Sequence, residues 1–188
     1  MTAALEDADQ EPAQHHPALR TVTESVMETK QLAARLAGLV RAGDVVLLVG
    51  DLGAGKTAFA QGFAAALGVP GPVTSPTFAL VRHYRTGAAS PVTHLIHADV
   101  YRTGSLDEVI DLALAELVEE DAVMLVEWGD VAAPALGESA LVVVLVAPDA
   151  VDAPERRDVT VELRGRWRER AAAVALALDS ELSPGGAA

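Results

Sequence analysis

Cysteine is absent from the 188-residue sequence, which excludes disulfides, thiolate metal sites and thiol nucleophiles. Lysine occurs only as Lys30 and Lys56, and aromatic residues make up just 4% of the chain. No apolar run approaches the length that a bilayer-spanning helix needs. The acidic, polar segment 1–18 also lacks the apolar stretch of a signal peptide. These absences predict a cytoplasmic protein without membrane association.

Positive charge is scarce as well, since the formal net charge is −13. Phosphate backbones attract surfaces rich in lysine and arginine, so this balance argues against a chain that binds DNA or RNA by itself. A role in RNA chemistry would therefore run through a protein partner. The acidic residues are spread along the chain, and solubility is the simplest explanation for them.

Length and composition predict one domain between two tails. Residues 1–19 are acidic and polar, and residues 181–188 are rich in small residues, so neither segment can bury a core. We therefore expect a disordered acidic tail at 1–19, a single domain over residues 20–180 and a flexible tail at 181–188.

Hydrophobic periodicity predicts strands that alternate with helices through this domain. Strands are expected at 21–23, 45–49, 77–84, 93–98, 123–126, 141–146 and 159–163. Helices are expected from the Ser25–Glu28 capping box to Gly43, from the glycine-rich loop to Gly68, and at 106–119 and 168–178. This order predicts an α/β three-layer fold with a largely parallel central sheet and some antiparallel strands. Ligands would then bind beyond the carboxyl ends of the strands.

The most informative segment is Gly50–Thr57, which reads G-D-L-G-A-G-K-T and matches the phosphate-binding pattern G-x-x-x-x-G-K-[ST]. It follows an apolar strand and precedes a helical pattern in which Phe59 and Phe63 lie one turn apart. Its glycines allow successive N–H groups to face phosphate oxygens, and the helix adds the positive end of its dipole. Lys56 would reach the β- and γ-phosphates, and the Thr57 hydroxyl would ligate Mg²⁺. The segment therefore predicts a nucleoside triphosphate site of the P-loop kind.

Two acidic residues are candidates for the group that a nucleotide hydrolase needs near Mg²⁺. Glu127 directly follows the apolar run 123–126, and Asp99 ends the segment Leu95–Ala98. An acid at the carboxyl end of a strand often simply meets solvent, but two of them in one phosphate-loop protein favour a catalytic role. Either of the two could orient the attacking water.

Three further features have both a functional and a simpler interpretation. Segment Val73–Phe78 could close over the γ-phosphate as a switch loop, although an ordinary proline turn explains the loop alone slightly better. Arg102 could steady transition-state charge or form an exposed salt bridge. His97 has no histidine or cysteine cluster beside it, so a packed or hydrogen-bonded side chain is favoured over a metal ligand.

The sequence also leaves two other classes of nucleotide-binding protein open. A small-molecule kinase would need a substrate base and an arginine-rich lid, and neither is clear. A regulatory subunit could sense ATP without needing hydrolysis. Guanine-specific recognition is unsupported because there is no Asn-Lys-x-Asp motif. An arginine cluster follows the predicted sheet, at Arg164, Arg166, Arg168 and Arg170. Its position indicates a solvated helix start or a contact surface rather than a lid.

Four segments, in their order and spacing, resemble the bacterial TsaE family, also called YjeE. They are Gly50–Thr57, Thr74–Phe78, His97–Arg102 and Leu125–Trp128, and the resemblance covers residues 20–165. The phosphate loop is shared with a very large superfamily, whereas the S-P-T, H-x-D-x-Y-R and E-W elements are far more specific. The combination therefore points to this family rather than to P-loop proteins in general.

The resemblance implies a weak, Mg²⁺-dependent ATPase that takes part in making threonylcarbamoyladenosine beside the anticodon of tRNA. Family members act with a transferase pair, TsaD with TsaB, and hydrolyse ATP to support its multiple turnover. The expected cofactors are thus ATP and Mg²⁺. The expected partner is a TsaD–TsaB-like complex, through which tRNA is reached indirectly.

The resemblance also assigns roles to single residues. Lys56, Asp99 and Glu127 are the expected catalytic residues, Thr57 and Glu127 are the expected metal ligands, and Thr77 belongs to a switch-like segment. The residues expected to contact the nucleotide are Asp51, Leu52, Gly53, Ala54, Gly55, Lys56, Thr57, Ala58 and Thr77. Many relatives have a second threonine where this chain has Ala58, so any nucleotide contact from that hydroxyl is lost.

Overall fold

The computed structural model describes residues 18–75, 81–101, 114–118, 121–149 and 153–179. The strands are β1 (Leu19–Thr23), β2 (Val45–Val49), β3 (Val81–Arg85), β4 (His94–Asp99), β5 (Ala122–Glu127), β6 (Ala140–Val146) and β7 (Arg157–Leu163). The α-helices are α1 (Val26–Ala37), α2 (Lys56–Ala66), α4 (Leu114–Leu117), α5 (Gly129–Leu136) and α6 (Ala171–Asp179). Two 3₁₀ helices, η1 (Gly137–Ser139) and η2 (Gly165–Arg170), precede β6 and α6.

The strands form a single sheet in the order β1-β7-β6-β2-β5-β4-β3. Its centre is parallel, because β2 pairs with β6 and β5, and β5 pairs with β4. The pairs β1–β7, β6–β7 and β3–β4 are antiparallel. The predicted α/β fold with a largely parallel sheet and some antiparallel strands is therefore confirmed. Because β2, β4 and β5 run in the same direction, Val49, Asp99 and Glu127 end at one edge of the sheet.

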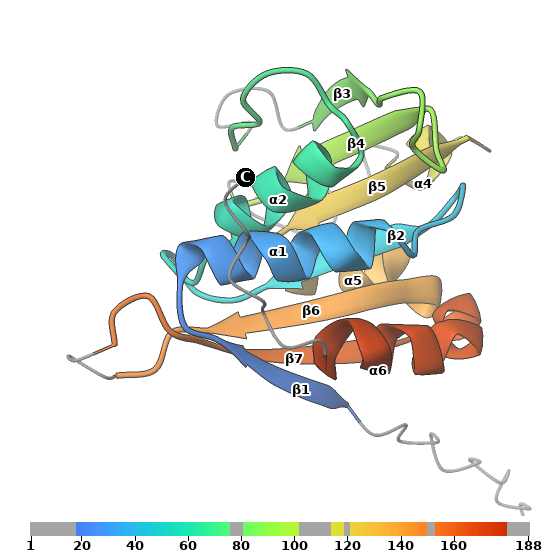
Figure 1. Ribbon diagram of the computed structural model, residues 1–188. Coiled ribbons are helices and arrows are strands. Elements are labelled where there is room, and N and C mark those ends of the chain that lie inside the picture. Colours follow the sequence, from blue (N-terminus) through green and yellow to red (C-terminus); the bar gives the residue numbers. More distant parts are fainter. Residues whose placement is uncertain (1–17, 76–80, 102–113, 119–120, 150–152, 180–188) are drawn as a thin grey trace, which may run out of the picture.

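Helices cover both faces of this sheet (Figure 1). On one face α1, α2 and α6 bury an apolar cluster that includes Phe59, Phe63 and Trp167. On the other face α4 and α5 cover a second cluster that includes Leu47 and Met124. Every residue of β5 is buried, as expected for a strand covered on both sides. None of the helices in the described part of the chain combines the length and the apolarity that crossing a membrane requires.

The first helix begins where the sequence predicts and ends earlier. Ser25 Oγ accepts a hydrogen bond from the Glu28 N–H (3.1 Å), so the predicted cap forms. The helix ends at Ala37 with Gly38 as its cap, and the expected end at Gly43 was wrong. Gly43 has a φ of 76° and lies in the turn that leads into β2. The apolar residues between the two glycines pack against the core without continuing the helix, which hid the boundary.

Two other elements differ from the prediction, and two lie partly outside the described residues. The strand expected at 77–84 begins at Val81 in the described residues, and the helix expected at 106–119 is described only from residue 114 onward. The helix α5 was not predicted, because Gly129 and Pro134 inside it interrupt the helical pattern. The last predicted helix is divided into η2 and α6.

The arginine cluster of η2 is only partly solvated, which corrects the prediction. Arg170 is buried, and both Arg166 and Arg170 form ion pairs with Asp44, which is itself buried just before β2. A buried carboxylate needs a compensating charge, and η2 supplies it from across the fold. Two arginines of the cluster therefore stabilise the fold through ion pairs with a buried carboxylate, so the cluster is not only a solvated surface.

Close packing of α1 and α2 depends on Gly62, which lies against the backbone of Lys30. A Cβ atom at position 62 would come within 2.3 Å of the Lys30 carbonyl oxygen. We expect Gly62→Ala to lower the free energy of unfolding by about 1–3 kcal/mol, because this clash outweighs the better helix propensity of alanine. Urea or thermal unfolding measures the loss. Gly38→Ala is the control, since a Cβ atom there meets nothing closer than a carbonyl oxygen at 3.4 Å. Equal losses in the two variants would contradict this explanation.

Candidate functional site

The phosphate loop connects the end of β2 to the first turn of α2. Gly50 lies so close to the end of β6 that a Cβ atom would come within 2.3 Å of the Leu145 carbonyl oxygen. Gly55, the residue before α2, has a φ of 104°, a left-handed conformation that favours glycine. Leu52 is 82% exposed within the loop. These glycines let the backbone curl at the N-terminus of α2, where the helix dipole favours an anion.

Lys56 is a buried cation whose ammonium group contacts the backbone of the loop itself. It is 5% exposed, and its Nζ donates hydrogen bonds to the carbonyl oxygens of Gly50 (2.6 Å) and Asp51 (2.8 Å). The same atom lies 3.7 Å from the centroid of the Trp128 ring, a cation–π contact. Burial lowers the pKa of Lys56, and the negative charge of Glu127 opposes that shift. An anion held by the loop would therefore have a partly desolvated cation beside it.

Hydrogen bonds join the start of α2 to the end of β5 and to β4. Thr57 Oγ1 donates to Glu127 Oε2 (3.0 Å), and Glu127 Oε1 lies 3.0 Å from His97 Nε2. Glu127 is 2% exposed and His97 is fully buried. Because a buried carboxylate needs hydrogen-bond partners, the two contacts fix the orientation of Glu127. His97 is packed and hydrogen-bonded, as the sequence predicts.

Asp99 ends β4 at the position that pairs with Glu127 in β5. Its Oδ2 accepts a hydrogen bond from Ser75 Oγ, and its Oδ1 accepts one from the Tyr101 N–H (3.1 Å). Ser75 belongs to the segment considered as a switch loop, so this bond brings that segment to the acidic residues. The two acids thus lie at equivalent positions of neighbouring strands, and the choice between them for orienting water stays a prediction.

Oxygen donors of the kind that Mg²⁺ prefers meet where Thr57 contacts Glu127. Among the described residues, no group of three or more His, Asp or Glu side chains could hold a metal ion alone. Magnesium usually combines one or two protein ligands with substrate phosphates and water. The donor set therefore fits a metal ion that arrives with a nucleotide better than a site formed by protein ligands alone.

Trp128 forms a wall of the site in an unusual backbone conformation. Its φ is 61° and its ψ is 44°, and it is the one described non-glycine residue with a positive φ. Its ring contacts Lys56 and also packs on Tyr101, with the ring centroids 4.6 Å apart. At the next residue, Gly129, a Cβ atom would come within 2.6 Å of the Leu47 Cβ, so glycine is needed where α5 begins. A left-handed backbone like that of Trp128 costs about 1–3 kcal/mol in a residue other than glycine, and such strained residues cluster at functional sites. The strain therefore favours a functional role for Trp128.

Some predicted residues lie outside the described ranges, and sequence reasoning missed others. Thr77 and Arg102 are outside the described residues. The stacking of Tyr101 on Trp128 was missed, and so was Arg157 at the start of β7. Its guanidinium donates hydrogen bonds to loop carbonyl oxygens from more than a hundred residues away along the chain. A lone arginine at that distance has no local sequence signal, and only the order of the strands brings it to the loop.

Comparison with known proteins places this site in a family. The model described as "Threonylcarbamoyl adenosine biosynthesis protein TsaE" matches residues 23–157. The chain belongs to the TsaE family. That range contains the phosphate loop, both acidic candidates, His97 and Arg157, and the resemblance predicted from the sequence motifs is confirmed.

Similar proteins named "tRNA threonylcarbamoyladenosine biosynthesis protein TsaE" support this membership. The one from Streptomyces coelicolor is 45% identical over 141 residues, covering 73% of this chain and 93% of that protein. The one from Treponema pallidum is 36% identical over 143 residues, covering 76% of this chain and 99% of that protein. The crystal structure of Bacillus subtilis YdiB has a TM-score of 0.64 and 31% identity, and covers 85% of this chain and 97% of that chain. The similarity to this solved structure therefore extends over most of the chain.

Proposed function

We propose that this TsaE family member binds ATP with Mg²⁺ and hydrolyses it slowly, in support of threonylcarbamoyladenosine synthesis in tRNA. The observation that carries the proposal is the joined set of Lys56, Thr57 and Glu127 at the N-terminus of α2. A buried cation, a hydroxyl and a carboxylate in this arrangement match the phosphate-binding and metal-binding parts of P-loop hydrolases.

Each part of the site has a task in the proposed reaction. The loop N–H groups and Lys56 bind the β- and γ-phosphates, and Thr57 and Glu127 hold Mg²⁺. The metal ion, when bound, neutralises the charge that develops on the phosphates. His97 keeps the Glu127 carboxylate oriented. Asp99 is partly exposed, so water reaches it more readily than Glu127, and it is the better candidate for orienting the attacking water.

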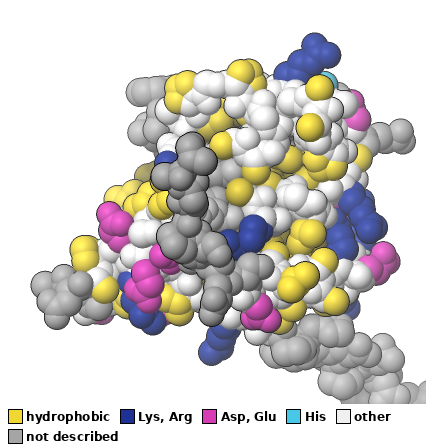
Figure 2. Space-filling view, viewed as in Figure 1, with side chains coloured by type: hydrophobic (Ala, Val, Ile, Leu, Met, Phe, Trp, Pro, Cys, Tyr) yellow, Lys and Arg dark blue, Asp and Glu magenta, His cyan; other side chains and the backbone are white. Residues whose placement is uncertain are grey.

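The proposed partner is a TsaD–TsaB-like transferase complex, which would hold the tRNA. A net charge of −13 argues against direct binding of this chain to a phosphate backbone. Figure 2 shows lysine and arginine side chains scattered among acidic and hydrophobic ones on the described part of the face that carries α1, α2 and α6. Such a mixed surface suits a protein partner better than RNA. Binding of the partner would also regulate the slow hydrolysis.

The test is ATP turnover by the purified protein, alone and with the TsaD and TsaB proteins of its own organism. We expect slow phosphate release that depends on Lys56 and rises when the pair is added. Lys56→Ala should remove ATP binding, because it deletes the cation that contacts the phosphates. Lys30→Ala is the control, since it changes the other lysine of the chain, which lies in α1 and is not part of the loop.

Two outcomes would separate the alternatives. Turnover that stays unchanged in the presence of the pair would exclude the partner-dependent ATPase, and phosphate transfer to small molecules would then be measured as expected for a kinase. Absence of Lys56-dependent ATP binding would exclude the nucleotide site altogether.

A further inference from the structure

Arg157 contacts two carbonyl groups of the phosphate loop. Its Nη2 donates to the Gly53 carbonyl oxygen (3.0 Å), and its Nε donates to the Ala54 carbonyl oxygen (2.9 Å). Its Nη1 donates to the carbonyl oxygens of Pro154 (2.9 Å) and Arg156 (2.6 Å). The planar guanidinium thus joins the turn before β7 to the middle of the loop through backbone contacts alone.

These contacts determine which way two peptide groups of the loop face. All peptide bonds in the described chain are trans, so the carbonyl and the N–H of one peptide group point in opposite directions. When Arg157 holds the carbonyl of Ala54, the N–H of Gly55 therefore points away from Arg157. The carbonyl of Gly53 is held in the same way, and the N–H of Ala54 donates to the Asp51 carbonyl oxygen (3.1 Å). The Ala54 N–H is thus used within the loop, whereas the Gly55 N–H faces away from Arg157, as an N–H group of an anion nest would.

The loop needs an external support because its own residues are permissive. Gly53 and Gly55 have φ values of 83° and 104°, and glycine has more backbone freedom to lose on ordering than any other residue. A contact from β7 that holds the loop reduces the conformational entropy that is lost when a nucleotide binds. Arg157 also carries a permanent charge, and no carboxylate of the described residues forms an ion pair with it. Its guanidinium is therefore held by backbone carbonyl oxygens, two of which belong to the loop.

We propose that Arg157 is a positioning residue that holds the phosphate loop in its nucleotide-binding shape. This inference rests on the proposed function, because it concerns the same loop. Arg157 acts equally on bound ATP and on the transition state, since it contacts only the backbone that holds the phosphates. We call the contacts of Arg157 with the carbonyl oxygens of Gly53 and Ala54 the clamp. Loss of the clamp therefore raises KM and the Kd for ATP while kcat changes little.

The test compares Arg157→Gln with Arg156→Gln in the full-length protein. Calorimetric titration with ATP and Mg²⁺ gives Kd, and phosphate release gives KM and kcat. If the loop of the Arg157→Gln variant adopts its binding shape about a tenth of the time, Kd rises about tenfold. Arg156 is the matched control, because it pairs with Glu24 (2.8 Å) and Asp158 (3.6 Å) and makes no loop contact. Its variant should keep the wild-type Kd.

Hydrogen exchange of the nucleotide-free proteins gives a second readout that does not need ATP. Faster exchange of segment 50–57 in Arg157→Gln, with the exchange of residues 58–66 of α2 unchanged, supports the clamp. A wild-type Kd in Arg157→Gln overturns the inference, and Lys56-dependent ATP binding in the same assay shows that the proposed function survives it. Absent ATP binding in the wild-type protein would instead overturn the proposed function.

Arg157→Lys decides the matter if the glutamine variant unfolds. Lysine keeps the charge but cannot donate through two nitrogens in a fixed fork. A folded lysine variant with a Kd above that of the wild type and faster exchange in segment 50–57 supports the clamp. A folded lysine variant with a wild-type Kd and wild-type exchange in segment 50–57 overturns it.

Discussion

Glu127→Gln is expected to lower the rate of ATP hydrolysis by about 10²–10³-fold, the size typical of losing one group that stabilises transition-state charge. Glutamine has nearly the same shape, so it can still accept a hydrogen bond from Thr57 and fill the buried position at the end of β5. It cannot supply the negative charge that a metal ligand provides there. We therefore expect a folded variant that still binds ATP but releases phosphate very slowly, as measured by steady-state turnover and calorimetric titration.

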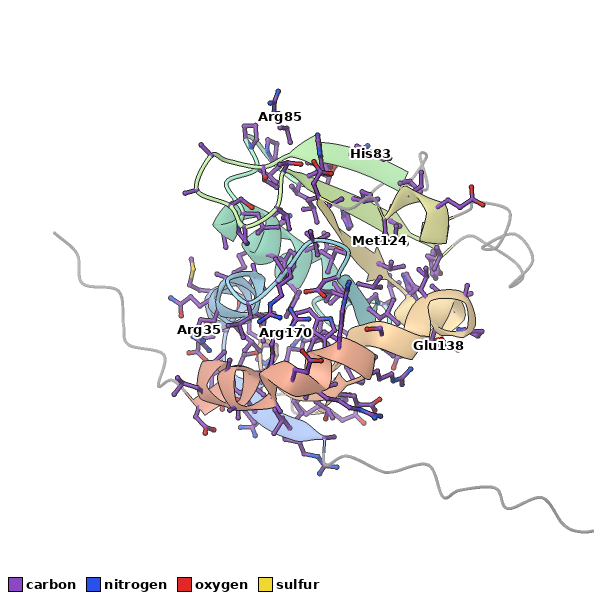
Figure 3. All side chains as sticks on the ribbon, turned by 90° about the vertical axis from the view of Figure 1, so that its right-hand side faces the viewer. Arg35, His83, Arg85, Met124, Glu138 and Arg170 are labelled. Atoms are coloured by element: carbon purple, nitrogen blue, oxygen red, sulfur yellow. The ribbon has the colours of Figure 1, made fainter. Side chains whose placement is uncertain are left out.

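Glu138→Gln is the matched control for this experiment. Glu138, labelled in Figure 3, is exposed and lies in η1, just before the start of β6. Because β6 is parallel to β2, Glu138 is at the opposite end of the sheet from the phosphate loop. Its substitution removes the same charge from the chain and should leave hydrolysis unchanged. A Glu127→Gln variant with normal turnover would contradict the assigned role. A variant that cannot hydrolyse ATP yet still supports tRNA modification by the transferase pair would favour the ATP-sensing subunit over the enzyme.

The parts of the site that the sequence predicts are those encoded within a few neighbouring residues. The phosphate loop combines a motif, a preceding apolar strand and a following helix, and the structure places Lys56 at the start of α2 accordingly. Glu127 follows a run that is buried on both faces, so its position at a strand end could be read from burial alone. Parallel strands then bring such ends to one edge of the sheet, which explains why Asp99 and Glu127 are neighbours.

The remaining parts depend on residues that are distant in the sequence. Arg157 contacts Ala54 across 103 residues, and Arg170 contacts Asp44 across 126 residues. No periodicity or motif connects such pairs, because the sheet order that joins them is not a local property. The helix α5 was missed for a different reason: Gly129 is needed for close approach to β2, and this packing requirement outweighs its poor helix propensity. Tertiary packing thus determined the features that local sequence patterns could not predict.

Asp44→Ala is expected to destabilise the fold by about 3–5 kcal/mol, the usual cost of breaking one side of a buried ion pair. Asp44 is fully buried and accepts hydrogen bonds from Arg170 Nη1 (2.5 Å) and Nη2 (2.9 Å) and from the Arg41 N–H (2.7 Å), and it forms an ion pair with Arg166 Nε (2.9 Å). Its loss would leave the guanidinium of Arg170, which is only 7% exposed, without a counter-charge. Arg170 is labelled in Figure 3 and also donates to the Leu39 carbonyl oxygen (2.9 Å), so the same change loosens the contact between η2 and the turn after α1.

Urea unfolding of Asp44→Ala and of the double variant Asp44→Ala/Arg170→Met separates the ion pair from simple loss of packing. The double variant should recover part of the lost free energy of unfolding, because it no longer buries an unpaired charge. Asp158→Ala is the control, since its side chain is 55% exposed and its pair with Arg156 is long, at 3.6 Å; we expect a loss of at most about 1 kcal/mol. Asp44 lies just before β2 and the phosphate loop lies just after β2, so the two are at opposite ends of this strand. The folded fraction of Asp44→Ala should therefore bind ATP with the wild-type Kd. A stability within about 1 kcal/mol of the wild type would show that η2 does not depend on this charge, whereas a large loss without recovery in the double variant would assign the effect to packing.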